Sequence, residues 1–445
     1  MQTVDDERWV ETGSDDARSK AASLRRFALG LSIIAAVALA IRVYWVLVGY
    51  SHYKVAGDAL YFHWQSWAVA DGHGFVNPFA FETTGQITPM AAHPPLYTLY
   101  LAFFSKLGLV TVTQHRLVSC LLGTGAVLLI GIAGRSIVNA RVGLIAAAIA
   151  ALYPSLWIND GMLLSEPMTA LLMPLVLLTA YRLWRAPQML NALWLGLALG
   201  ATALNRGEAA LLAAFVVLPL LIGMRSLAIR QRVALLTTVA LTMIVLVAPW
   251  VGYNLRRFEE PTFLTDHTGA VLRAASCDRA YYGEFAGWYF CPIPAFPGDA
   301  SEQDARLLAE ARGYTRSHLG RLPTVALIRV GRLWDVYNVR QTIDLNANVE
   351  GRTKTATQLA VLSFWLLAPF AIAGLIVLRR RGEPISPFLA PIIVVTIAAA
   401  TTYGVARYRV SAEPGIVLAA AVSIDALWRR LARRRLQSDT APIPT

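Results

Sequence analysis

The feature that most constrains this chain is a series of apolar runs, each about as long as a helix that crosses a membrane. A bilayer core of about 30 Å needs about 20 helical residues. Hydrophobic residues make up 56% of the chain and charged residues 15%, whereas soluble domains carry about 25% charged residues. We therefore expect an all-α integral membrane protein with about ten transmembrane helices. The expected spans lie at about residues 27–48, 115–134, 139–158, 162–184, 188–205, 208–224, 233–252, 357–378, 386–404 and 411–428.

The formal net charge of +12 comes from short basic clusters between these runs. In a soluble protein such a charge would suggest nucleic acid as a partner, but here the positive-inside rule accounts for it and predicts no nucleic-acid binding. If the helices alternate in direction, the clusters fall on one side, which is then the cytoplasm. We expect a multi-pass protein of the cell (plasma) membrane whose first helix is retained as a signal-anchor. The clusters are Arg25/Arg26, Arg135/Arg141, Arg182/Arg185, Arg225–Arg232, Arg379–Arg381 and Arg429–Arg435.

Two long polar segments then lie on the extracytoplasmic side. The first contains an apolar stretch, Leu96–Leu107, that is too short to span the bilayer and predicts an interfacial or re-entrant helix. The second contains the amphipathic patterns Glu302–His318 and Val325–Tyr337. The latter is typical of a helix on the membrane surface, and packing inside the protein would explain it equally well. The expected domains are a cytoplasmic tail 1–26, a transmembrane module 27–252 with its first outward loop 49–114, an extracytoplasmic segment 253–356, C-terminal helices 357–430 and a cytoplasmic tail 431–445.

Cys277 and Cys291 lie together in the second of these segments, which the orientation places in an oxidising compartment. A disulfide between them would close a loop of about 14 residues and contribute about 3 kcal/mol. Two free thiols are the alternative.

Ionisable residues at the outward ends of the apolar runs are the candidates for function, because charges near hydrocarbon are costly. Each has a structural explanation alone: Asp58 as a helix cap, Glu166 as an ion-pair partner of Arg206 or Arg42, and the late arginines as lipid anchors. Their convergence on one side of the membrane favours a site. The candidates are Asp58, Asp160, Glu166, Arg206, Glu208, Arg407 and Arg409, with Arg42 inside the first helix.

Carboxylates there can act as a general base, and arginines can hold a phosphate through paired donors. Together they suit a transfer with a phosphate leaving group and a lipid-anchored donor. The sequence has no Walker motif and no recognisable zinc motif. No cofactor is certain, although Asp58 with Glu166 could hold a divalent cation.

Several short motifs are similar to those of GT-C-type membrane glycosyltransferases, in particular the protein O-mannosyltransferase, aminoarabinose-transferase and lipid A galacturonosyltransferase-like group. Ser165-Glu166-Pro167 resembles the second acidic motif of that group. The resemblance covers about residues 27–430. The other matching motifs are Gly57-Asp58-Ala59-Leu60-Tyr61, Ala70-Asp71-Gly72-His73-Gly74-Phe75, His93-Pro94-Pro95-Leu96-Tyr97, Pro249-Trp250 with Asn254, and Ala406-Arg407-Tyr408-Arg409 before Glu413-Pro414.

The resemblance implies a GT-C-like fold and an enzyme that moves a sugar from a polyprenyl-phosphate donor to an extracytoplasmic glycan, lipid or protein, with inversion. Asp58 would be the base or the acid that positions the acceptor, and Glu166 its acidic partner. Arg407 and Arg409 would bind the donor phosphate, His93 and Tyr61 would line the site, and Arg42 and Arg206 are further substrate-binding candidates. A transporter or flippase of a lipid-linked precursor is the alternative, and it favours ionisable groups at mid-membrane. A structural subunit is a third option.

Overall fold

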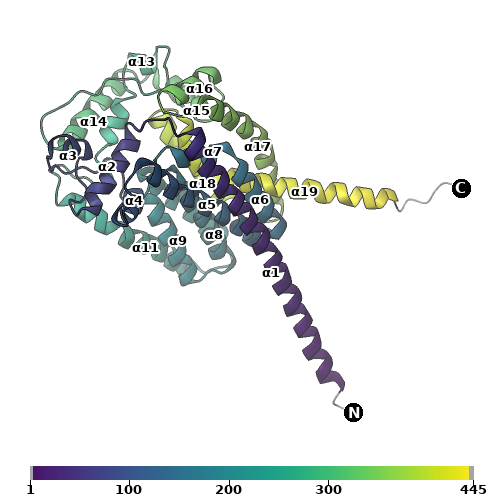
Figure 1. Ribbon diagram of the computed structural model, residues 1–445. Helices are drawn as coiled ribbons and strands as arrows, with labels where there is room; N and C mark the ends of the chain where they lie inside the picture. Colours follow the sequence, from purple (N-terminus) through teal and green to yellow (C-terminus); the bar gives the residue numbers. More distant parts are fainter. Residues whose placement is uncertain (1–3, 440–445) are drawn as a thin grey trace.

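The computed structural model describes residues 4–439, and these residues fold into helices (Figure 1). Within that range the only strand-like pairing is an isolated bridge between Val76 and Pro89, so the all-α prediction is confirmed. The helices are α1 (Val4–Tyr44), η1 (Trp45–Gly49), α2 (Asp58–Ala70), α3 (Pro78–Thr84), α4 (Leu96–Lys106), α5 (Val112–Ile137), α6 (Ala140–Leu152), α7 (Pro154–Trp157), η2 (Ile158–Gly161), α8 (Glu166–Arg185), α9 (Met189–Ala203), η3 (Gly207–Leu211), α10 (Leu212–Gly223), α11 (Ile229–Leu255), α12 (Thr268–Arg273), α13 (Asp278–Tyr281), α14 (Ala300–Ser317), α15 (Leu322–Leu333), α16 (Val339–Asn348), α17 (Lys354–Arg380), α18 (Ser386–Thr401), η4 (Ala406–Ser411) and α19 (Glu413–Asp439).

Five of the described helices are long and apolar enough to cross a membrane, and a bent pair, Ala140–Leu152 with Pro154–Gly161, would make a sixth. Three further apolar helices are shorter: Met189–Ala203, Gly207–Gly223 and Ser386–Thr401. The chain is thus built as a membrane protein, while the count of about ten spans stays a prediction. The five are Ala21–Gly49, Val112–Ile137, Glu166–Arg185, Ile229–Leu255 and Lys354–Arg380.

The run expected as one helix at 139–158 is bent by 62° instead. Tyr153 has extended backbone angles and Pro154 opens the next helix. Proline cannot donate the backbone hydrogen bond of a continuous helix, and it disfavours helical angles at the residue before it.

The central core is formed by α1, α5, α6, α8, α17 and α19. Small residues let these helices approach closely, as they do in many membrane proteins. At Gly374 of α17 an added Cβ would lie 1.8 Å from the Ala419 carbonyl oxygen of α19, so only glycine fits there.

Helices of the two long polar segments gather at one end of the molecule, away from the projecting ends of α1 and α19 (Figure 1). The short apolar helix expected at 96–107 is α4, and the amphipathic pattern at 302–318 is α14. The pattern at 325–337 corresponds to α15, which buries Arg329 and Arg332. Both guanidinium groups donate to backbone carbonyls of neighbouring segments, and this fixes α15 in the assembly.

The sulfur atoms of Cys277 and Cys291 are joined in a disulfide that closes the loop around α13. Cys291 is buried beside Ala280, Tyr281 and Val325, so the bond lies in a small apolar core beneath α15.

Candidate active site

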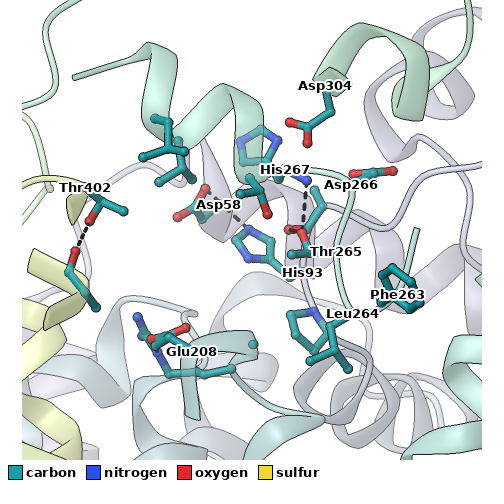
Figure 2. A pocket seen from close by; sticks show the side chains of 18 of the residues that line it. Asp58, His93, Glu208, Phe263, Leu264, Thr265, Asp266, His267, Asp304 and Thr402 are labelled. Atoms are coloured by element: carbon teal, nitrogen blue, oxygen red, sulfur yellow. Dashed lines mark hydrogen bonds and ion pairs between the residues drawn. The ribbon is translucent and has the colours of Figure 1, made fainter. Parts of the chain in front are cut away.

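A cavity of about 800 Å³ opens between the two long segments and the ends of α8, α9 and α18 (Figure 2). Apolar side chains such as Phe263 and Leu264 form part of its wall. Its charged and titratable lining includes most of the residues selected from the sequence, namely Asp58, His93, Glu166, Arg206, Glu208 and Arg407.

Asp58 is the first residue of α2, where the helix dipole favours a negative charge. Gly57 before it has a φ of 55°, a conformation that glycine adopts without strain. The Asp58 carboxylate accepts a hydrogen bond from Nη2 of Arg407 at 3.0 Å and lies 3.5 Å from Nε2 of His93. Its side chain is 38% exposed, so it also faces the cavity. Burial opposes its charge, but the hydrogen bonds and charges of His93 and Arg407 prevail and hold the pKa of Asp58 well below its usual range.

Arg407 is surrounded by carboxylates. Besides Asp58, its Nε lies 2.9 Å from Glu350 and its Nη1 3.9 Å from Glu166. Glu350 and Glu166 are only 3% and 2% exposed, so both buried charges need a cationic partner inside the protein. Glu350 did not stand out in the sequence, because it follows α16 in a segment without a motif.

Arg206 extends the same cluster to the end of α9. Its Nη1 donates to Glu166 at 3.1 Å and its Nε to Glu208 at 2.5 Å, while its guanidinium carbon lies 4.9 Å from the ring centroid of Tyr408. Nη2 of Arg206 has no hydrogen-bond partner within residues 4–439. Glu166 therefore bridges the two arginines, and one donor group of Arg206 is left for a ligand.

His93 lies in a loop that the second long segment holds in place. The Asp266 carboxylate accepts a hydrogen bond from the Ala91 backbone N–H at 2.7 Å, and the Asp266 N–H donates to the Ala91 carbonyl at 3.0 Å. The Thr265 hydroxyl donates to the Ala92 carbonyl at 2.7 Å. Backbone hydrogen bonds thus fix His93 relative to residues 265 and 266.

Tyr61 is buried and does not line the cavity, although it had been expected at the site. Its ring packs edge-on against His93 with the centroids 5.1 Å apart, and its hydroxyl has no hydrogen-bond partner in the described chain. Tyr61 supports His93 from behind.

Arg42 and Arg409 are not brought to the cavity. Arg42 pairs with Asp160 at 2.8 Å, and both side chains are fully buried. Arg409 pairs with Asp335 at 2.7 Å and with Glu413 at 2.6 Å and is 2% exposed. Both arginines have their charges satisfied inside the protein.

A second cavity, of about 340 Å³, lies on the other side of Asp58 and Arg407 and is lined also by Tyr50, Lys54 and Glu350. His267, which the sequence did not single out, lines both cavities. Nothing in the sequence marks it, because it lies in a long polar segment outside any recognisable motif.

No group of three or more His, Cys, Asp and Glu side chains within residues 4–439 is arranged to hold a metal ion. The carboxylates of Asp58 and Glu166, considered as ligands of a divalent cation, both face Arg407. Two carboxylates that share a guanidinium group do not suit a divalent cation.

Residues 92–253 match the family described as dolichyl-phosphate-mannose-protein mannosyltransferase. No curated protein sequence matches the chain. The fold is similar to that of an oligosaccharyltransferase from Archaeoglobus fulgidus. Its structure tethered to an acceptor peptide has a TM-score of 0.56 and 16% identity, over 92% of this chain and 50% of that one. Its complex, as AglB, with an inhibitory peptide and a dolichol-phosphate has a TM-score of 0.53 and 14% identity, over 93% and 52%.

ArnT from Cupriavidus metallidurans bound to undecaprenyl phosphate has a TM-score of 0.46 and 16% identity, over 88% of this chain and 77% of that one. This chain spans about half the length of the oligosaccharyltransferase structures that it matches. The resemblance to GT-C-type membrane glycosyltransferases is confirmed.

Proposed function

We propose that this protein is a membrane glycosyltransferase that moves a sugar from a polyprenyl-phosphate donor to an acceptor on the extracytoplasmic face. The observation that carries the proposal is the ion-paired cluster of Asp58, Glu166, Arg206 and Arg407 on the wall of a cavity of about 800 Å³. The family match supports it, because residues 92–253 include His93, Glu166 and Arg206.

In the proposed reaction an acceptor hydroxyl attacks the anomeric carbon from the face opposite the phosphate. The bond from that carbon to the phosphate oxygen breaks, and the configuration inverts. Asp58 orients the acceptor hydroxyl, and Glu166 fixes the two arginines. Arginine donors stabilise the negative charge that develops on the departing phosphate.

Arg206 is the better placed of the arginines for that phosphate. Its Nη2 has no partner within residues 4–439, whereas Arg407 already faces Asp58, Glu166 and Glu350. Arg409, also expected to bind the phosphate, is not part of the proposal. Its side chain does not line the cavity and forms ion pairs with Asp335 and Glu413.

The geometry does not favour a transporter. Such a protein would use ionisable groups at mid-depth, and Arg42 with Asp160 is the pair that comes nearest to this description. These two side chains are fully buried against each other, and neither lines the two cavities described above.

The test is to incubate the purified protein with a panel of radiolabelled undecaprenyl-phosphate sugars and a membrane extract as acceptor source. We expect release of undecaprenyl phosphate from at least one donor. The Asp58→Asn variant should release none, and the exposed-site control Asp71→Asn should match the wild type. Movement of intact donor across vesicle membranes, without release by the wild type, would establish the transporter instead.

A further inference from the structure

His267 is placed at the meeting point of the two cavities. It precedes α12 in the chain and lines both the cavity of about 800 Å³ and that of about 340 Å³. Its ring centroid lies 6.4 Å from that of His93, and Figure 2 shows Asp58, His93 and His267 around the same space. Neither ring nitrogen of His267 hydrogen-bonds to another residue within 4–439.

The backbone around His267 is held firmly. Its N–H donates to the Thr265 hydroxyl at 3.1 Å, and the same hydroxyl donates to the Ala92 carbonyl. Asp266, the residue before it, exchanges hydrogen bonds with Ala91. On the other side, Asp304 of α14 accepts a hydrogen bond from the Ala270 N–H at 2.9 Å, at the start of α12. The imidazole is therefore presented by a fixed scaffold, as a catalytic group requires.

Asp58 is a poor proton acceptor in this setting. Its pKa lies well below the usual range, and a carboxylate stabilised so strongly in its charged form takes up a proton only at low pH. Its contacts with Arg407 and His93 suit it to orient a hydroxyl rather than to deprotonate it.

The pKa of His267 is also lowered, but for a histidine a lowered pKa favours the uncharged form, which can accept a proton. Burial lowers the pKa of His267, the nearby His93 lowers it further, and the charge of Asp58 partly offsets both effects. The other charged groups that line these cavities include Asp304 and Asp266 in the large one, Glu350 and Lys54 in the small one, and Arg407 in both. At neutral pH the ring is uncharged, so one nitrogen has a lone pair that can accept a proton.

We propose that His267 is a catalytic residue of this transfer, the general base that takes the proton from the acceptor hydroxyl. The inference rests on the proposed function. As the acceptor oxygen bonds to the anomeric carbon, its proton moves to a ring nitrogen of His267. The electron pair of the breaking bond leaves with the phosphate oxygen. The products are the glycoside, the polyprenyl phosphate and an imidazolium, which then returns its proton to water.

The first test compares His267→Gln with the wild type, using the undecaprenyl-phosphate sugar that the wild type cleaves. General-base catalysis contributes about 100- to 10,000-fold, so we expect kcat to fall at least about 100-fold while KM for the donor changes little. His73→Gln is the matched control, since His73 is exposed on the first long segment. Added imidazole should restore part of the activity of His267→Ala.

The second test is the pH dependence of kcat/KM in the wild type, which does not depend on how a variant folds. We expect activity to fall on the acid side, with a midpoint below the ordinary histidine pKa of about 6.5. Asp266→Asn should retain this acid limb, and His267→Gln should lose it in its residual activity.

The outcomes separate the two proposals. A wild-type protein that cleaves no donor overturns the proposed function and this inference with it. A wild type that cleaves a donor, together with His267→Gln of equal kcat, overturns the inference alone. So does a wild-type profile that is flat below about pH 6.5.

Discussion

Arg407 and Asp58 are 349 positions apart in the chain, yet Nη2 of the arginine lies 3.0 Å from the carboxylate of the aspartate. The first long segment supplies the acid, and the turn before the last helix supplies its counter-charge. The site therefore exists only in the completely folded chain.

Asp58→Asn should abolish sugar transfer while the protein still inserts and folds. The neutral amide keeps the size of the side chain but removes the charge that Arg407 and His93 face. The measurement is release of polyprenyl phosphate by purified variant, normalised to its amount. Activity near the wild-type level would remove Asp58 from the mechanism.

Arg206 and Arg409 should respond differently to substitution. Arg206→Lys keeps the charge but loses the planar pair of donors, so we expect donor kcat/KM to fall about 10- to 100-fold with stability little changed.

Arg409→Ala leaves Asp335 and Glu413 buried without their partner, which costs about 3–5 kcal/mol. We expect little folded protein from it, as judged by size-exclusion chromatography in detergent. Folded Arg409→Ala with a selective loss of donor use would reverse these assignments.

Asp266 makes stability depend on pH. Burial raises the pKa of Asp266 from its usual value of 3.8 to about 6, although the Ala91 N–H and Arg257 act in the opposite direction. Between these values the folded state binds more protons than the unfolded state, so stability decreases as pH rises towards 6 and is then constant. Asp266→Asn lacks this loss and should be more stable above pH 6, by at most about 3 kcal/mol.

Thermal unfolding midpoints of the wild type and Asp266→Asn, measured at pH 5 and pH 8, check this sign. At pH 8 the wild type should have a lower unfolding midpoint than Asp266→Asn. At pH 5 the difference between the midpoints of the two proteins should be smaller. A wild type that gains stability between these pH values relative to the variant would contradict the raised pKa.

The disulfide should stabilise the second long segment. Replacing both Cys277 and Cys291 by serine opens a loop with a sequence separation of 14 residues, and the expected loss is about 3 kcal/mol. We expect a lower thermal midpoint and faster proteolysis between α12 and α14. In the wild type, alkylation without reductant should leave both cysteines unlabelled, and labelling of either one would contradict the bond.

The sequence predicted the parts of the site that lie at helix ends. Asp58, Glu166, Arg206 and Arg407 each flank an apolar run, and the ends of neighbouring helices meet at one level in such a bundle. Apolar length and charge position were sufficient for these residues.

The choice of ion-pair partners could not be predicted. Arg407 and Arg409 are two positions apart on η4, a 3₁₀ helix with three residues per turn, so their side chains point about 120° apart. One faces the cavity and the other the core. The pairing of Arg42 with Asp160 is likewise determined by packing between helices. The Asp160 carboxylate fits against Gly123, where an added Cβ would lie 2.5 Å from its oxygens.

Glu350 and His267 were missed for a different reason. Both lie in parts of the second long segment outside its two amphipathic patterns, where no periodicity indicates which side chains face inwards. Their roles arise from long-range contacts between segments that are far apart in the chain.

The pairing of Ala91 and Ala92 with Thr265 and Asp266 has a consequence for engineering. A chimera that takes only residues 253–356 from another protein would not preserve the hydrogen bonds to Ala91 and Ala92, which hold the loop of His93. Segment 49–114 has to be exchanged together with it. The two segments are therefore one structural unit for the purpose of domain exchange.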